Sequence, residues 1–234
     1  MIYITTYPLP QRINPMRKLL LTTAAVAAAI AGAVAAEPSF GTFTDTRDGQ
    51  TYKTVKIGEQ TWMARNLNYK TDSSWCYNND TSYCNKYGRL YNWKTAQTAC
   101  PAEYHLPSRE EWDNLVDAAN AYKKDGKTLK TRRGWKGWNK NGTDDYGFSA
   151  QPSGVRTTGG EFYDIGEQGD WWTNAEVAEE RNLGDRAHFW NLINYSNDGR
   201  FFCILCCPIN FSKFDLLIYP KNNGLAVRCV ADRP

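Results

Sequence analysis

Three cysteines near the end of the chain are the side chains with the clearest capacity for chemistry. Cys203, Cys206 and Cys207 lie close together within an apolar run. Thiolates at such spacing can carry redox chemistry or bind copper. On an extended strand, however, Cys203 and Cys207 face one side and Cys206 faces the other, so the three sulfurs do not converge. We therefore expect buried structural cysteines, and the odd total of seven leaves at least one thiol unpaired within a monomer.

A second pair of cysteines closes a short polar segment. Cys76 and Cys84 are eight residues apart, across a stretch rich in Asn, Asp and Ser. In an exported protein a local disulfide is the simplest interpretation of this spacing. A zinc site is the alternative, but the two histidines, His105 and His188, lie far away in the sequence.

Residues 134–147 combine tryptophan with Gly, Asn and Asp, and we expect them to form a long, ordered loop. Binding residues concentrate on loops held by a rigid scaffold. Tryptophan offers a flat, amphipathic face that can stack on a sugar or anchor a protein partner. The candidate binding residues are Trp135, Trp138, Asn139, Asn141, Asp144 and Asp145. We expect each of the two indoles to present at least one ring face to solvent.

Oxygen-bearing side chains alternate along this loop, as they do in calcium-binding loops. They stand at Asn139, Asn141, Thr143 and Asp145, but the distal Glu of an EF-hand is missing. The same side chains can satisfy the backbone of the loop as Asx-turns. Calcium is therefore the minor interpretation, and no other metal or cofactor is predicted.

No catalytic set is evident in the sequence. The acidic pairs at 110–111 and 179–180 are adjacent, whereas a glycosidase needs two carboxyls that face each other across a cleft. Neither histidine belongs to a triad pattern, and no Gly-rich phosphate motif occurs. We therefore predict no catalytic residues.

A helix is the element with the clearest start signal. Ser108 can accept a hydrogen bond from the helix N-terminus, and Glu111, three residues later, completes a capping box. Pro107 keeps the residue before it extended. The apolar side chains then recur on one face, at Trp112, Leu115, Val116 and Ala119. We expect one main helix near residues 109–122, with its apolar face packed against a large surface.

Short strands account for most of the remaining ordered chain. Asp48-Gly49 is a two-residue hairpin signal, and residues 40–69 are predicted to form a β-meander. The segment between Cys76 and Cys84 is expected to be a polar loop. Further strands are expected at 148–152, 169–174, 187–193, 201–208 and 225–230. These elements predict a mixed α+β domain with short strands and long loops.

Residues 1–36 have the pattern of a secretory signal. Met16-Arg17-Lys18 precedes the apolar run 19–34, and small residues follow to Ala36. We expect cleavage near Ala36, with Met16 a candidate for the true start. Because the apolar run is short and no second one follows, no permanent membrane span is expected. Residues 37–234 then form a single domain that is periplasmic, displayed on the cell surface or secreted.

The charge balance does not favour a nucleic-acid partner. The whole chain carries a formal net charge of +3, but residues 1–36 contribute three basic and no acidic side chains. The mature chain is therefore formally neutral, with 25 residues of each sign. Without an excess of basic residues, a nucleic-acid-binding surface is not expected.

An ordered set of short motifs resembles the Fibrobacter succinogenes major paralogous domain. The motifs are Phe43-Thr44-Asp45 to Asn66-Leu67-Asn68, Gly88-Arg89-Leu90-Tyr91-Asn92-Trp93, Cys100-Pro101, His105-Leu106-Pro107-Ser108 with Glu111-Trp112, Gly142-Thr143-Asp144-Asp145-Tyr146-Gly147-Phe148, Trp171-Trp172 and Val227-Arg228-Cys229. They cover essentially the whole mature chain. The segment around Pro107 is also similar to one that opens a helix in formylglycine-generating-enzyme and C-type-lectin-like folds. Residues 201–220 depart from the family pattern, because they are more apolar and carry the three extra cysteines.

The resemblance implies a C-type-lectin-like or formylglycine-generating-enzyme-like α+β domain whose ends meet. It also implies a disulfide between Cys100, beside the main helix, and Cys229, in the last strand. For function, it implies an exported, non-catalytic binding or adhesion module for polysaccharide or another surface component, such as a surface protein. The alternative is an enzyme of the formylglycine-generating type that uses the C-terminal cysteines in redox or copper chemistry.

Overall fold

The computed structural model describes residues 38–121, 126–137, 140–177, 185–193 and 217–232. Residues Glu37–Pro234 form one compact unit. Its strands are β1 (Ser39–Thr44), β2 (Thr51–Ile57), β3 (Gln60–Met63), β4 (Ser74–Trp75), β5 (Leu90–Tyr91), β6 (Tyr104–His105), β7 (Val155–Arg156), β8 (Phe162–Tyr163), β9 (Gln168–Glu176), β10 (Arg186–Ile193), β11 (Leu217–Pro220), β12 (Leu225–Ala226) and β13 (Val230–Ala231). Its helices are the 3₁₀ turn η2 (Tyr77–Asn79) and the α-helices α2 (Thr81–Tyr87), α3 (Trp93–Ala99) and α4 (Arg109–Ala118). The predicted mixed α+β class is confirmed.

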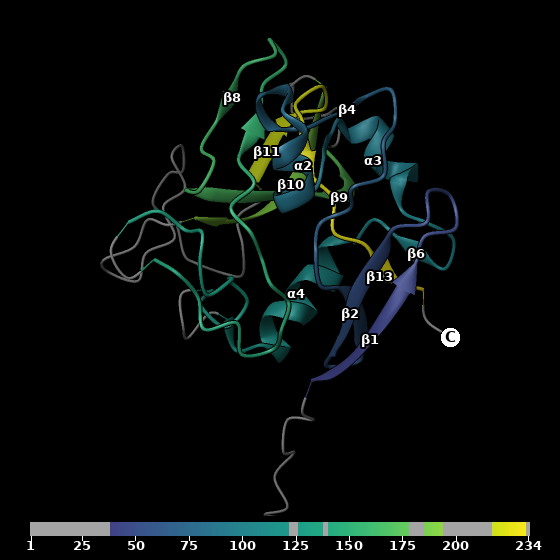
Figure 1. Cartoon of the computed structure of the whole chain (residues 1–234), viewed down its shortest axis with the longest axis vertical. Coiled ribbons are helices and arrows are strands. Elements are labelled where there is room, and N and C mark those ends of the chain that lie inside the picture. The colour runs from purple at the N-terminus through teal and green to yellow at the C-terminus, as the bar shows by residue number, and fades with distance from the viewer. Residues whose placement is uncertain (1–37, 122–125, 138–139, 178–184, 194–216, 233–234) are drawn as a thin grey trace, which may run out of the picture. The chain divides into compact units, whose positions relative to one another are not determined.

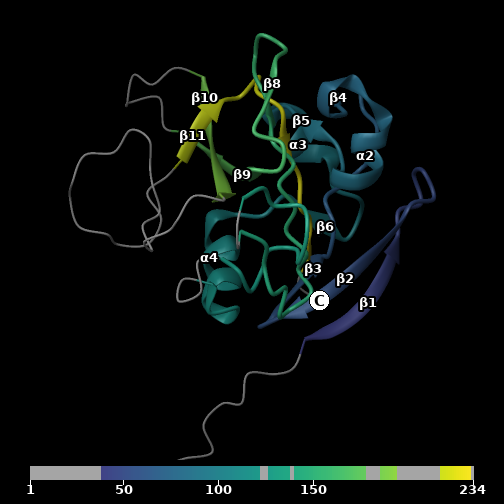
Figure 2. The ribbon, with the colours of Figure 1, turned by 60° about the vertical axis from the view of Figure 1, so that its left-hand side comes forward.

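Two larger sheets and one small hairpin organise the described strands. A five-stranded sheet has the order β1-β2-β3-β13-β6, and a six-stranded sheet has the order β11-β10-β9-β12-β5-β4. Strands β7 and β8 form a separate hairpin. Figures 1 and 2 both place β1 and β2 to one side of α4, with β9 and β10 above it. The first and last strands of the unit therefore share one sheet, as the resemblance implied.

The predicted β-meander is confirmed by β1, β2 and β3. Asp45 closes the first hairpin, because its backbone N–H donates to the carbonyl of Gln50 at 2.8 Å. Gly49 lies in that turn with a φ of 74°, a conformation that favours glycine. Strands β1 and β2 then pair without a register shift.

The predicted capping box at the start of α4 is present. The side chain of Ser108 accepts a hydrogen bond from the backbone of Glu111, and the Glu111 carboxylate accepts one from the backbone of Ser108. The helix ends at Ala118, four residues before the predicted end at 122. Asn120 has a φ of 47°, so the backbone has already left the right-handed helical region.

Trp112, the first apolar residue of α4, joins the two larger sheets. Its ring stacks on Trp190 of β10 with centroids 4.5 Å apart, and it contacts Trp62 of β3 at 4.8 Å. Trp171 of β9 lies 6.1 Å away. These rings are buried with the apolar side chains of both sheets, so α4 seals the space between them.

Arg228 is a second buried link between distant segments. Its guanidinium donates to Asn66 Oδ1 from Nη2 at 2.7 Å, to the carbonyl of Phe148 at 2.6 Å and to that of Met63 at 3.1 Å. Asn66 Oδ1 also accepts from Trp171 Nε1 at 2.8 Å. Complete burial lowers the pKa of Arg228 to about 9. Because a buried charge needs such partners, Arg228 fixes three segments relative to one another.

The structure corrects three sequence predictions of local structure. Residues 148–152 form no strand; only Ala150 makes an isolated bridge, to Lys130. The segment between Cys76 and Cys84 contains a turn and the start of helix α2 instead of an irregular loop. The predicted strand at 225–230 is divided into β12 and β13, which belong to different sheets. The predicted strand at 201–208 lies outside the described residues.

Candidate binding surface

Both disulfides are formed. The sulfurs of Cys76 and Cys84 are 2.05 Å apart, and those of Cys100 and Cys229 are 2.06 Å apart. The first bond closes the short segment that contains η2 and the first half of α2. The second joins the end of α3 to the segment between β12 and β13, across a sequence separation of 129. The two pairings predicted from the sequence are therefore confirmed.

The segment closed by Cys76 and Cys84 is ordered by its own caps. Asp80 precedes α2, and its carboxylate accepts a hydrogen bond from the backbone of Ser82 at 2.8 Å. Gly88 ends the helix with a φ of 77°. A polar residue at the helix start and glycine at its end are ordinary boundary signals, although the polar composition favoured a loop.

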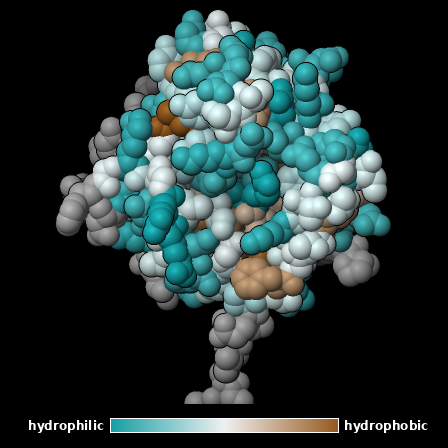
Figure 3. Space-filling model, viewed as in Figure 1, coloured by the Kyte–Doolittle hydropathy of each residue, from teal (hydrophilic) through white to brown (hydrophobic). Residues whose placement is uncertain are grey.

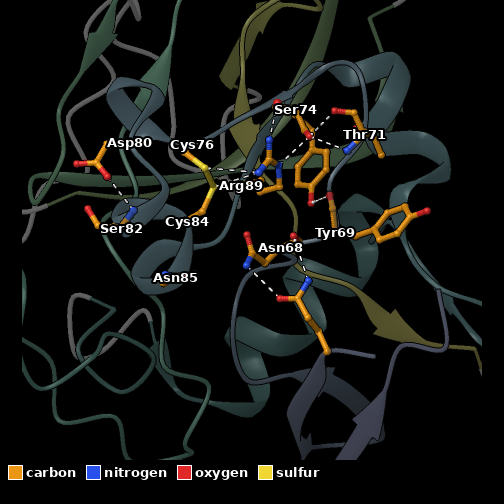
Figure 4. Close-up of a disulfide and its surroundings, with 12 residues drawn as sticks. Asn68, Tyr69, Thr71, Ser74, Cys76, Asp80, Ser82, Cys84, Asn85 and Arg89 are labelled. Atoms are coloured by element: carbon orange, nitrogen blue, oxygen red, sulfur yellow. Dashed lines mark hydrogen bonds between the residues drawn. A yellow bond between two sulfur atoms is a disulfide. The ribbon is translucent and has the colours of Figure 1, made fainter. Parts of the chain in front are cut away.

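Arg89 ties this disulfide to the edge of the six-stranded sheet. Figure 4 shows its guanidinium pointing toward both sulfurs, with Nη1 3.5 Å from Cys76 Sγ and from Cys84 Sγ. Its Nε donates to Ser74 Oγ at 2.8 Å, and its Nη2 donates to the Ser74 carbonyl at 2.9 Å. Burial lowers the pKa of Arg89. The disulfide, α2 and β4 are consequently held as one rigid piece.

Aromatic rings from η2, α2 and β8 form a continuous series beside this rigid piece. Tyr77 contacts Phe162 of β8 with centroids 5.2 Å apart, and it contacts Tyr83 of α2 at 5.3 Å. Tyr83 stacks on Tyr87 at 6.1 Å. We define Trp75, Tyr77, Tyr83, Tyr87 and Phe162 as the aromatic strip.

Arg156 joins the remaining member, Trp75, to the strip. Its guanidinium carbon lies 4.1 Å from the centre of the Trp75 ring and 5.9 Å from that of Phe162. A guanidinium over aromatic faces is attracted by their negative electrostatic potential. Arg156 therefore connects β4 to the β7–β8 hairpin, although these elements are about eighty residues apart in the sequence.

The strip is partly open to solvent. Tyr77 and Tyr87 are buried, whereas Trp75, Tyr83 and Phe162 are half-buried. The residues near strip members in the sequence, Asn78, Asn79, Glu161 and Tyr163, are exposed. Figure 3, in the region where Figure 1 places α2 and β8, shows hydrophilic areas beside smaller hydrophobic ones. Flat rings with a polar rim can hold a ligand by stacking and hydrogen bonds, without acid–base chemistry.

The expectation of an exposed ring at Trp135 is wrong. Only 3% of Trp135 is exposed, and its ring belongs to the cluster around Trp112 and Phe148. Its Nε1 donates to Thr131 Oγ1 at 3.2 Å and to the Ala150 carbonyl at 3.3 Å. The ring is drawn inward because the core offers it both apolar contacts and acceptors. Trp138 and Asn139 lie outside the described residues.

The polar candidates of the same loop mostly bond to the loop itself. Asn141 Oδ1 accepts from the Trp135 backbone at 3.0 Å. Asp144 accepts from the backbone and the hydroxyl of Ser149 at 2.8 and 2.7 Å. Asp145 is exposed. Asn141 thus satisfies the backbone of the loop, as the sequence allowed, but its donor lies six residues earlier, so the contact is not an Asx-turn. Among the candidates that the structure describes, Trp135 is buried and Asp145 is exposed, so these two do not share a binding face.

Among the described residues, no group of three or more His, Cys, Asp or Glu side chains could hold a metal ion. Cys203, Cys206 and Cys207 lie outside those residues. No helix within the described ranges has the length and apolar character needed to cross a bilayer.

His105 is held between two carboxylates, away from the aromatic strip. Its Nδ1 lies 2.6 Å from Asp232 Oδ1, and its Nε2 lies 2.8 Å from Glu111 Oε1. Burial alone would lower the pKa of His105, but the two hydrogen bonds and the negative charges outweigh it and raise that pKa. The contacts connect β6, α4 and the residue after β13, so this histidine has a structural role.

Asp170 of β9 is the most strongly perturbed carboxyl in the described chain. Complete burial raises its pKa to about 7, although hydrogen bonds from Asn191 at 3.2 Å and Gln168 at 2.8 Å oppose the shift. Perturbed carboxyls often mark active sites. This one is fully buried, however, and therefore has no open path to a substrate.

The aromatic strip was not predicted from the sequence. The available signal was the density of rings, since Trp75, Tyr77, Tyr83 and Tyr87 fall within thirteen residues around one disulfide. Phe162 could not have been added, because nothing local links it to that segment.

The comparisons with known proteins identify one family. The sequence model of the family described as the Fibrobacter succinogenes major domain matches residues 55–231. The match includes every residue of the aromatic strip, and β1 lies before it. No curated protein and no solved structure matches the chain.

Proposed function

The chain belongs to the Fibrobacter succinogenes major domain family, and from this premise we propose that it is an exported, non-catalytic module that binds polysaccharide. The observation that carries the proposal is the aromatic strip beside the Cys76–Cys84 bond. A C-type-lectin-like or formylglycine-generating-enzyme-like fold is part of the same proposal. It is supported by the mixed sheets and by the helix that follows Pro107.

The chemistry of the strip supports a sugar ligand. The apolar faces of pyranose rings stack on flat aromatic side chains, and hydroxyl groups pair with amides and carboxylates at the rim. Trp75, Tyr83 and Phe162 supply half-buried rings, and Asn78 and Asn79 supply exposed amides. Because the disulfide and Arg89 hold the rings in place, binding would require little ordering of side chains.

Export is supported by two independent features. Residues 1–36 show the charged, apolar and small-residue order of a secretory signal. The two disulfides are typical of an oxidising compartment. We place the mature module in the periplasm, on the cell surface or in the medium.

Calorimetric titration of the unit 37–234 against soluble cello-, xylo- and manno-oligosaccharides tests the proposal. Replacement of Tyr83 or Trp75 by Ala should weaken binding by roughly 1 to 3 kcal/mol, as for aromatic stacking on other flat ligands. Tyr146→Ala, in the loop at 134–147, is the matched control and should leave affinity unchanged. Near-UV circular dichroism verifies that each variant is folded. Equal loss in Tyr146→Ala, or no binding to any of the three oligosaccharides, would contradict the proposal.

A further inference from the structure

Strand β1 presents an open edge of the five-stranded sheet. It is the outermost strand in the order of that sheet, and within the described part of the chain it pairs with β2 alone. Its six residues, Ser39–Thr44, carry no charged side chain and no proline. All but Phe43 are exposed, and Phe40 is 65% exposed.

The other outer strands of the two larger sheets are protected. Strands β4 and β6 have only two residues each. Strand β11 ends in Pro220. Natural proteins protect sheet edges in these ways, and also with charges or bulges, because an open edge pairs with another strand. Strand β1 has none of these protections, which indicates that its edge is used.

The pairing pattern shows which backbone groups face outward. The Asp45 N–H donates to the Gln50 carbonyl, so Asp45 bonds toward β2. Bonding direction alternates along an antiparallel strand. The N–H and C=O groups of Phe40, Thr42 and Thr44 therefore point away from β2, toward the open edge.

We propose that two copies of this chain associate through β1, antiparallel, with the two-fold axis at Thr42. In this register Thr42 pairs with Thr42 of the partner subunit, and Phe40 pairs with Thr44 of the partner subunit. The three outward-facing residues of each copy thus complete one ladder with about six hydrogen bonds. The two five-stranded sheets become one continuous sheet.

A second copy is the occupant that fits this edge. The strand is uncharged, and the mature chain is formally neutral, so neither local nor long-range repulsion opposes the contact. The three outward positions are symmetric about Thr42, so the edge is complementary to itself. The contact area of one short ladder is below that of a standard interface, so the dimer is weak, with a dissociation constant of the order of 10 to 100 µM.

Sedimentation equilibrium of the unit 37–234, from about 10 µM to 1 mM, gives the dissociation constant. Thr42→Pro removes the outward N–H without touching the hydrogen bonds to β2, and it should weaken association by roughly tenfold or more. Thr42→Val keeps the N–H and is the matched control, with unchanged association. Thr42→Lys places two like charges opposite each other and should weaken association most at low salt. Thermal unfolding confirms that each variant is folded.

Oxidative cross-linking tests the register without depending on those variants. Thr42→Cys should form a disulfide-linked dimer, because directly opposed residues have Cα atoms about 5.5 Å apart. Thr44→Cys alone should not, but its mixture with Phe40→Cys should. The chain without an added cysteine, oxidised in parallel, shows how much cross-linking comes from the cysteines that are already present. A monomer at every concentration, cross-linking of Thr44→Cys alone, or association unaffected by both Thr42→Pro and Thr42→Lys would overturn the proposal.

Discussion

Two segments of this protein have similar amino-acid composition but differ in how far their aromatic side chains are exposed to solvent. Residues 75–87 and residues 134–147 both combine tryptophan or tyrosine with Asn and Asp. In the first segment, rings remain half-exposed beside a disulfide, whereas in the second Trp135 is buried in the core. Aromatic and polar content alone therefore does not identify a binding loop.

The cause lies in how each segment satisfies its backbone. In residues 75–87, a turn and a helix bond the backbone to itself, and the side chains of Asn78 and Asn79 remain exposed. In residues 134–147, the side chains of Asn141 and Asp144 accept hydrogen bonds from backbone N–H groups. A loop that uses its polar side chains to order itself has fewer of them left for a ligand.

The strongest test of this contrast is Trp135→Ala. The change deletes a buried ring and leaves a cavity, so it should lower the free energy of unfolding by about 3 to 5 kcal/mol. Urea unfolding measures the loss. Tyr83→Ala, in the half-exposed segment, should cost no more than about 1 kcal/mol. Similar losses in the two variants would remove the distinction between the segments.

Removal of the Cys76–Cys84 bond should have an intermediate effect. The double replacement Cys76→Ser and Cys84→Ser frees a short loop, and loop entropy predicts a loss of about 2.5 kcal/mol. The same variant should weaken oligosaccharide binding, because the rings lose their support. Unfolding and titration on one preparation separate the two effects. Full affinity without the bond would show that the strip does not depend on it.

The smallest expected effect concerns pH, and it should involve neither segment, because neither contains a histidine. The pKa of His105 is raised in the folded state. Its stabilising contribution is therefore complete below its unfolded pKa of about 6.5 and is lost as pH rises through the folded value. Because His105 is partly exposed, we expect less than about 1 kcal/mol.

Unfolding of the wild type and of His105→Gln between pH 5 and 9 measures this contribution. The difference in stability should be largest at pH 5 and vanish at pH 9. Asp170, with a pKa of about 7, titrates in the same range but contributes equally to both proteins. A difference that grows with pH would contradict the sign.

Elements with local signals could be predicted from the sequence. Ser108 and Glu111 define the start of α4, because a capping box acts over a few residues. Asp48-Gly49 marked the position of the first hairpin, but the predicted two-residue turn is wrong, because the loop closed by Asp45 and Gln50 has four residues. The Cys100–Cys229 pairing followed from the resemblance to a family. The division of residues 225–230 between two sheets could not be predicted, because the strands that pair with β12 and with β13 lie far away in the sequence.

The candidate site was predicted less well than the fold. The aromatic strip needs Phe162 and Arg156, which meet Tyr77 and Trp75 only after the chain has folded. The exposure of a tryptophan is equally non-local. Trp135 is buried because Thr131 and Ala150 offer acceptors beside the apolar core, and its loop composition gave no sign of this.

The Cys100–Cys229 bond also has a mechanical meaning. While both disulfides are intact, a force that separates the two ends of the compact unit runs along residues 38–76, crosses the Cys76–Cys84 bond, follows residues 84–100, crosses the Cys100–Cys229 bond and leaves through residues 229–232. Residues 101–228 bear no tension while the bond is intact. Only residues 38–76 and 84–100 can be drawn out. They carry Trp75 and Tyr87, whereas Tyr77 and Tyr83 remain behind the Cys76–Cys84 bond, and Phe162 and the tryptophans of β9 and β10 remain behind the Cys100–Cys229 bond.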